Sequence, residues 1–140
     1  MTEMKMLIVD DVSIMRKVIK GILIDHCKVD PENIIEAADG AEAIMMYKEC
    51  TPDIVFLDIT MPDISGKDVI NELRKIDPEA IIVMCSGSGD KASVIECIRA
   101  GAKDYIRKPI THERLVKALD KAEGFVLVKR LLSGEEIFED

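Results

Sequence analysis

The segment Met6-Leu7-Ile8-Val9-Asp10-Asp11 decides the fold, because a short apolar run ends abruptly there in two carboxylates. An apolar run without alternation is typical of a strand that is buried on both faces of a parallel sheet. From Ile14 to Leu23, apolar side chains then recur at helical spacing. A buried strand followed by an amphipathic helix is the repeating unit of α/β folds.

The same unit recurs along the chain. Further strands are predicted at Asn33–Ala37, Ile54–Leu57, Ile81–Cys85 and Asp104–Arg107, and a stretch with helical period follows each of them. Five strand–helix units in strict alternation predict an α/β fold with a doubly wound, five-stranded parallel sheet and helices on both faces. Right-handed crossovers leave few strand orders open, and 2-1-3-4-5 is the common order at this size.

The composition fits one compact, acidic domain. Of the 140 residues, 48% are hydrophobic and only 4% are aromatic, so the core must be mostly aliphatic. The net charge of −8 and the lack of a basic run argue against nucleic acid or an anionic membrane as a partner. No apolar run approaches the roughly 20 residues of a membrane span, and no signal peptide is expected. The four cysteines match no disulfide or zinc spacing and are interpreted as reduced thiols of a cytoplasmic protein.

Polar side chains follow four of the five predicted strands, at the point where each strand ends. Asp10 and Asp11 follow the first strand, Asp58 the third, Ser86 the fourth and Lys108 the fifth, whereas the second contributes nothing comparable. Open α/β sheets bind ligands outside the carboxyl ends of the strands, at the switch point between strands one and three. Taken singly, Asp11 or Ser13 could cap the first helix, Asp58 could cap a turn, and Ser86 and Lys108 could be ordinary surface groups. Taken together, they predict a site.

Three clustered carboxylates require a cation, because like charges raise each other's pKa. Mg²⁺ fits best, since it accepts a few carboxylate ligands and keeps several waters. A carboxylate beside Mg²⁺, faced by an ammonium and a hydroxyl group, suits phosphoryl transfer. Asp58 is then the nucleophile that forms an aspartyl phosphate, Asp10 and Asp11 hold the metal, and Lys108 and Ser86 contact the phosphoryl oxygens.

These residues resemble the receiver domain of two-component response regulators. The resemblance covers about residues 4–123 and is carried, in order, by Val9-Asp10-Asp11, Asp58-Ile59-Thr60-Met61-Pro62, Gly66, Ser86-Gly87, Gly101-Ala102 and Lys108-Pro109. Within the family, the chain is most similar to stand-alone chemotaxis proteins of the CheY type. The resemblance implies a flavodoxin- or CheY-like three-layer sandwich.

The resemblance implies a phosphorylation-activated signalling switch, not a conventional enzyme. A sensor histidine kinase or a histidine phosphotransfer domain would donate the phosphoryl group to Asp58, and the only catalysis would be self-phosphorylation and self-dephosphorylation. Mg²⁺, with Mn²⁺ as a substitute, would be bound by Asp11, Asp58 and the backbone carbonyl of Thr60, with help from Asp10.

The resemblance also implies how the switch works. Ser86 would move toward the phosphoryl group, and Tyr105 would swing inward. The changed surface of the fourth helix, fifth strand and fifth helix would then bind a target protein, such as a flagellar motor switch. The family's Lys108-Pro109 bond is typically cis, and Gly87 stands where the family more often has Ala.

Two alternatives remain open. A haloacid-dehalogenase-like aspartyl-phosphate phosphatase also uses an Asp after a strand, but it typically has a second Asp where this chain has Thr60. A pseudo-receiver would bind partners independently of phosphorylation, but it normally lacks one of the five site residues, all of which are present.

The resemblance divides the chain into a receiver domain at residues 1–123 and a C-terminal extension at residues 124–140, without a separate output domain. Residues 125–132 are too apolar for a solvated tail, and we expect them to continue the last helix. The stripe that this helix would bury contains Leu115, Leu119, Ala122, Val126 and Leu132, flanked by Phe125 and Val128. It would pack on the domain or on a second copy, giving a monomer or a weak dimer. Residues 133–140 are expected to be disordered.

Overall fold

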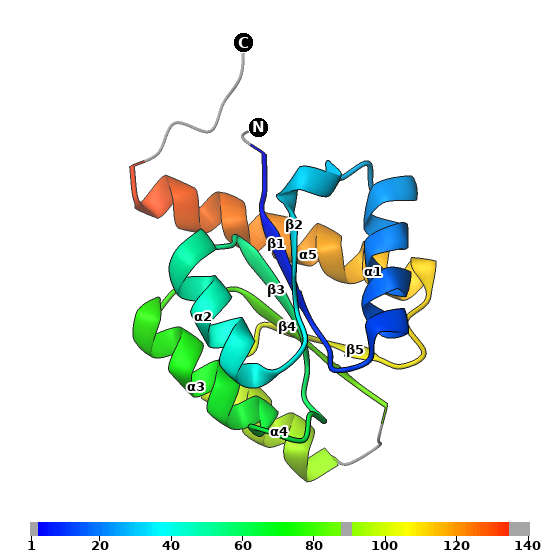
Figure 1. Cartoon of the computed structure of the whole chain (residues 1–140). Coiled ribbons are helices and arrows are strands. Elements are labelled where there is room, and N and C mark those ends of the chain that lie inside the picture. Colours follow the sequence, from blue (N-terminus) through cyan, green and yellow to red (C-terminus); the bar gives the residue numbers. More distant parts are fainter. Residues whose placement is uncertain (1–2, 88–90, 135–140) are drawn as a thin grey trace.

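One parallel sheet forms the middle layer of the protein. The computed structural model describes residues 3–87 and 91–134. Its strands are β1 (Met6–Val9), β2 (Ile34–Ala37), β3 (Ile54–Asp58), β4 (Ile82–Ser86) and β5 (Asp104–Arg107). They lie in the order β2-β1-β3-β4-β5 (Figure 1), which confirms the predicted α/β fold and strand order.

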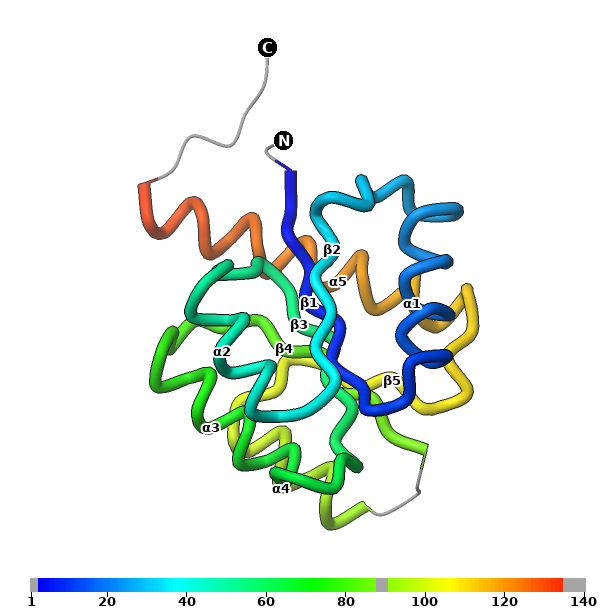
Figure 2. Tube along the Cα trace, in the orientation of Figure 1, coloured from blue at the N-terminus to red at the C-terminus, as the bar shows by residue number. Residues whose placement is uncertain are grey.

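Helices cover both faces of the sheet. They are α1 (Ser13–Asp25), α2 (Gly40–Cys50), α3 (Gly66–Ile76), α4 (Lys91–Ala100) and α5 (His112–Leu132), with a short 3-10 helix, η1 (Pro31–Asn33), before β2. As Figure 1 and Figure 2 show, α1 and α5 lie on one face and α2, α3 and α4 on the other. Among the described helices, none has the length and apolarity that a membrane crossing requires.

The two faces of the sheet build two separate cores. On β1, Met6 and Ile8 pack with α1 and α5, whereas Leu7 and Val9 pack with α2, α3 and α4. All four side chains are buried because successive residues of a strand point to opposite faces, and both faces are covered here. This double burial is the reason why the strand reads as an unbroken apolar run.

Gly66 shows how tightly the segment after β3 folds back over the sheet. A Cβ atom added to Gly66 would lie 2.5 Å from the Cβ of Ile59, closer than two carbon atoms can approach. Ser65, just before it, accepts a hydrogen bond from the backbone N–H of Asp68 and so caps α3. The loop between β3 and α3 is therefore held close to the end of the strand.

The last helix continues past the end of the family resemblance. α5 runs without interruption through Gly124 to Leu132, so the predicted helix at residues 125–132 is confirmed. Val126 is only 1% exposed and packs in the core beneath α1 and α5. Part of the predicted apolar stripe thus packs on the domain itself.

Two details of this extension differ from the prediction. Leu132 is 81% exposed, and the buried position beyond Val126 is Arg130 instead, because one helical turn leads from residue 126 to residue 130. Ser133, expected to be disordered, is the C-cap of α5, and its hydroxyl donates to the carbonyl of Arg130. The disorder expected for residues 135–140 concerns a segment outside the described residues.

Candidate functional site

The carboxylates predicted to cluster do so at the carboxyl edge of the sheet. β1 and β3 are neighbours with Val9 opposite Leu57, so the residues after them, Asp10 and Asp58, lie side by side. Carboxylate oxygens of Asp10, Asp11 and Asp58 all lie within 4.8 Å of one another. Asp10 and Asp58 are buried, whereas Asp11 is exposed at the mouth of the cluster.

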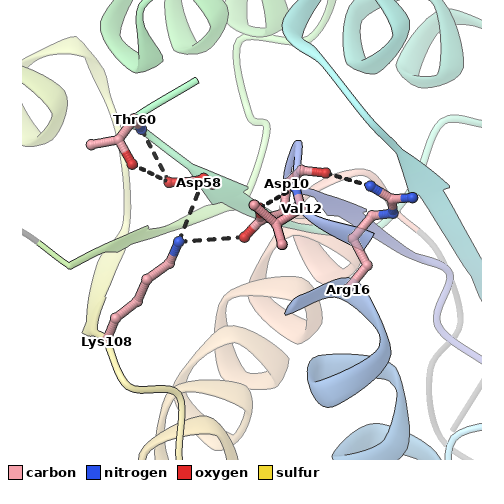
Figure 3. Close-up of polar contacts among 6 residues, drawn as sticks. All are labelled: Asp10, Val12, Arg16, Asp58, Thr60 and Lys108. Carbon is pink, nitrogen blue, oxygen red and sulfur yellow. Dashed lines mark hydrogen bonds and ion pairs between the residues drawn. The ribbon is translucent and has the colours of Figure 1, made fainter. Parts of the chain in front are cut away.

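Lys108 reaches the cluster from the end of the edge strand β5, which is separated from β3 by β4. Its backbone N–H donates to the carbonyl of Ser86, which fixes the end of β5 beside the end of β4. The ammonium nitrogen Nζ lies 3.4 Å from Asp10 Oδ2 and 3.5 Å from Asp58 Oδ2 (Figure 3). The Lys108-Pro109 peptide bond is cis, as expected. One ammonium group therefore forms ion pairs with two buried carboxylates.

The charges of the cluster are unbalanced. Burial raises the pKa of Asp10, and the charge of Asp58 raises it further, against the opposing effects of the Val12 amide and Lys108. Burial lowers the pKa of Lys108, but Asp58 and Asp10 outweigh this and hold it above its ordinary value. Lys108 thus stays protonated, yet the cluster keeps an excess of negative charge. Hard carboxylate oxygens in this number fit a divalent cation such as Mg²⁺.

The two oxygens of Asp58 have different surroundings. Oδ1 accepts hydrogen bonds from the backbone N–H of Thr60 at 3.0 Å and from its hydroxyl at 2.8 Å. Oδ2 faces the ammonium of Lys108. Asp58 therefore caps a turn and belongs to the acidic cluster at once, so that these two interpretations of the sequence are compatible.

Asp10, not Asp11, organises the start of α1. The N-cap position is Val12, whose backbone N–H donates to Asp10 Oδ1 at 2.9 Å. The alternative in which Asp11 or Ser13 caps this helix is therefore wrong, because Val12 occupies the N-cap position and Ser13 is already the first helical residue. Asp11 is left facing solvent beside the other two carboxylates.

Ser86 and Tyr105, the predicted switch residues, lie on the two strands beyond β3. Ser86 is fully buried at the end of β4, one residue past the partner of Asp58 in the ladder. Tyr105 lies on β5 opposite Met84 and is half-buried, with its ring against the core beneath α2, α3 and α4. Their movement on phosphorylation, and the role of the Thr60 carbonyl as a metal ligand, stay predictions.

Sequence reasoning missed one residue at this site, Arg16 of α1. Its Nη1 donates to the backbone carbonyl of Asp10 at 2.6 Å, and its Nε donates to Glu36 Oε1 at 3.2 Å. β2 therefore does contribute, through Glu36. The available signal was a charged residue, Glu36, between apolar residues of the predicted second strand, together with a basic residue on the first turn of the helix after the first strand.

Comparison with known proteins identifies the family of the chain. A family profile described as the response regulator receiver domain matches residues 6–120. Chemotaxis protein CheY of Thermotoga maritima is 50% identical over 117 residues, which cover 84% of this chain and 95% of the relative.

Solved structures agree with this match. A response regulator receiver domain protein from Clostridium thermocellum superimposes with a TM-score of 0.79 at 32% identity, over 92% of this chain and 98% of that one. NtrX from Brucella abortus reaches a TM-score of 0.83 at 31% identity over 95% of this chain, which spans 29% of that longer protein. Because sequence and structure match over most of its length, the chain belongs to the response regulator receiver domain family.

Proposed function

We propose that the chain is a phosphorylation-activated signalling switch with Asp58 as its phosphoacceptor. The observation that carries this proposal is the position of Asp58 Oδ2, which is buried in an acidic cluster and faces the ammonium of Lys108 at 3.5 Å. A carboxylate held beside a fixed cation can attack a phosphoryl group while the developing charge is stabilised. The family match supports this assignment over the haloacid-dehalogenase-like alternative.

The reaction follows from the groups around Asp58. A carboxylate oxygen forms a bond to phosphorus, while the bond to the nitrogen of the donor's phosphohistidine breaks and the imidazole leaves. Lys108 pairs with one phosphoryl oxygen, and the hydroxyl of Ser86 donates to another. Asp10, Asp11, Asp58 and the Thr60 carbonyl would hold a divalent cation, Mg²⁺ or in its place Mn²⁺, which would further neutralise the phosphoryl oxygens. Hydrolysis of the acyl phosphate returns the switch to its resting state.

The proposed donor is a sensor histidine kinase or a histidine phosphotransfer domain. The proposed output is the binding of a target protein to the surface of α4, β5 and α5. Since the relative from Thermotoga maritima is a chemotaxis protein, a flagellar motor switch is the first target to test. The proposed location is the cytoplasm, a reducing compartment in which the four cysteines would stay thiols.

The direct test is phosphorylation by acetyl phosphate. Intact-protein mass should increase by one phosphoryl group with Mg²⁺, and the gain should disappear with a chelator or in the variant Asp58→Asn. Because asparagine keeps the shape of the side chain, circular dichroism should be unchanged. Labelling that persists in Asp58→Asn or without divalent cation contradicts the proposal.

A second test separates the switch from a pseudo-receiver. A switch requires that phosphorylation stabilise one of two conformations over the other. The ring of Tyr105 should therefore change its rotamer between the free protein and the beryllofluoride complex, in which the BeF₃⁻ group on Asp58 imitates the phosphoryl group. An unchanged rotamer, with target binding independent of beryllofluoride, would instead identify a pseudo-receiver.

A further inference from the structure

The backbone and side chain of Asp10 are held at every polar atom. The backbone N–H donates to the carbonyl of Ala37 on β2 at 3.2 Å, and the backbone carbonyl accepts from Arg16 at 2.6 Å. The carboxylate accepts from Val12 N at 2.9 Å and faces Lys108 at 3.4 Å. Of these partners, only Arg16 binds the peptide group between the two adjacent carboxylates of the site.

Arg16 is itself fixed by a partner on β2. Its Nε lies 3.2 Å from Glu36 Oε1, and Lys20 Nζ lies 3.5 Å from the other oxygen of the same carboxylate. The Arg16 side chain is 17% exposed and that of Glu36 is 34% exposed, so this pair is partly shielded from solvent. The planar guanidinium can donate to two acceptors in fixed directions, which a lysine ammonium cannot imitate.

The geometry points to Arg16 as a positioning residue for the divalent-cation site, with Glu36 as the group that fixes it. The guanidinium of Arg16 anchors the Asp10 carbonyl (Figure 3). Because Glu36 holds the guanidinium in place, this contact sets the direction in which the Asp10 and Asp11 carboxylates leave the strand. Groups behind the ligands of a metal site commonly control its affinity in this way. The inference rests on the proposed function, because it assumes a divalent cation at these carboxylates.

Removal of Arg16 should change the Mg²⁺ affinity in opposite directions, depending on whether Arg16 acts through its charge or by positioning the carboxylates. This difference makes the inference testable. A positive charge near a cation site repels the cation, so a role of Arg16 through charge alone means that its removal tightens Mg²⁺ binding. A positioning role means that its removal weakens binding, because the two carboxylates lose their common direction. Lys17 is the matched control, since it is exposed, adjacent and equally charged.

The experiment is a calorimetric titration with MgCl₂ at constant ionic strength and without any phosphodonor. We expect Arg16→Ala to weaken Mg²⁺ binding by about 10-fold, as for other groups behind metal ligands. Arg16→Lys keeps the charge but loses the planar guanidinium that donates to two acceptors, so it should show most of the same loss of Mg²⁺ affinity. Lys17→Ala should leave the affinity unchanged or slightly higher. Amide chemical shifts of Asp10 and Asp11 should move in both Arg16 variants before Mg²⁺ is added.

The role of Glu36 is tested by a double-mutant cycle. Glu36→Gln should weaken Mg²⁺ binding in the wild-type background and have a much smaller effect when Arg16 is already alanine. Equal effects in both backgrounds, or Arg16→Ala behaving like Lys17→Ala, would overturn the inference. Should Arg16→Ala fail to fold, Arg16→Lys decides alone. A protein that binds Mg²⁺ in this manner but is not phosphorylated contradicts only the proposed function.

Discussion

The carboxyl and amino edges of the same sheet hold their carboxylates in opposite electrostatic states. At the carboxyl edge, Asp10 and Asp58 share one cation, Lys108, at 3.4 and 3.5 Å. At the amino edge, Asp77 has a cation of its own, Lys129, at 2.6 Å. Burial raises the pKa of Asp10. Burial also raises that of Asp77, but hydrogen bonds, above all from Lys129, outweigh it and hold the pKa below its ordinary value.

The amino edge also binds the end of the last helix at a second point. The guanidinium of Arg130 donates to Asp53 Oδ1 at 3.2 Å and to the carbonyl of Glu3 at 3.3 Å. Asp53 Oδ2 in turn accepts from the backbone N–H of Lys5. Both cations belong to the extension. Carboxylates at the amino edge thus stabilise the fold, whereas those at the carboxyl edge keep an excess of negative charge that fits a divalent cation.

Removing the extension should have the largest effect on stability. A chain that ends at Glu123 loses Val126 from the core and both cations of the amino edge. We expect the free energy of unfolding to fall by about 3 kcal/mol, measured by urea denaturation. A chain ending at Gly134 is the control. Sedimentation of both forms shows whether the extension also joins two copies of the chain. If the chains ending at Glu123 and at Gly134 were equally stable, the stabilising role assigned to the amino edge would be wrong.

Lys129→Met should have a smaller effect, of about 1 kcal/mol, because the ion pair with Asp77 is partly exposed. Tyr47, which donates to the same carboxylate, keeps its partner. Since the folded-state pKa of Asp77 is depressed, its contribution is present above its ordinary pKa near 3.8 and is lost as the pH falls through the folded value. The difference between wild type and variant should therefore shrink in acid. A constant difference down to pH 2 would contradict this assignment.

The opposite edge should respond with the opposite sign. Because the folded-state pKa of Asp10 is raised, its ionised form costs stability at neutral pH, and this cost disappears as the pH falls toward its ordinary value. We expect Asp10→Asn to raise the free energy of unfolding by up to about 1 kcal/mol while weakening Mg²⁺ binding. Asp77→Asn, its counterpart at the amino edge, should lower stability. If both variants changed the free energy of unfolding in the same direction, the contrast between the two edges of the sheet would be wrong.

Two glycines near the carboxyl edge give the smallest and most local test. A Cβ added to Gly87 would lie 3.6 Å from Cδ of Lys108, an ordinary contact. Gly87→Ala should therefore stabilise the protein by about 0.5 kcal/mol, because alanine lowers the conformational entropy of the unfolded chain. Phosphorylation should be unaffected. Gly66→Ala, which would collide with Ile59, should be destabilising. Thermal unfolding of the two variants measures both effects, and a destabilised Gly87→Ala protein would show that this loop needs glycine.

The fold and most of the site could be predicted because they depend on local patterns. Strands buried on both faces must be apolar throughout, so β1, β3 and β4 are visible as uninterrupted runs. A parallel sheet brings the carboxyl ends of its strands to one edge, so polar residues after those runs, such as Asp10 and Asp58, must meet there. Each step needs only sequence order and the geometry of a strand.

Contacts between distant elements could not be predicted in this way. Hydropathy favoured Leu132 over Arg130 as the buried residue of the extension, yet the structure has the reverse. The helical period brings Arg130 to the amino edge of the sheet, and Asp53, 77 residues away, pairs with its guanidinium there. Burial of a charge depends on a partner that only the assembled fold supplies.

The sequence by itself determined the order of the elements, the parallel sheet and the cluster of carboxylates at its carboxyl edge. Only the tertiary structure decided how the cations are shared: Lys108, expected at the carboxyl edge, lies between Asp10 and Asp58 there, whereas Asp77 at the amino edge has Lys129 to itself. It also placed Arg16 between Asp10 and β2. The physical reason is separation along the sequence. Strand and helix patterns depend on interactions within a few residues, whereas an ion pair between distant residues depends on where whole helices pack.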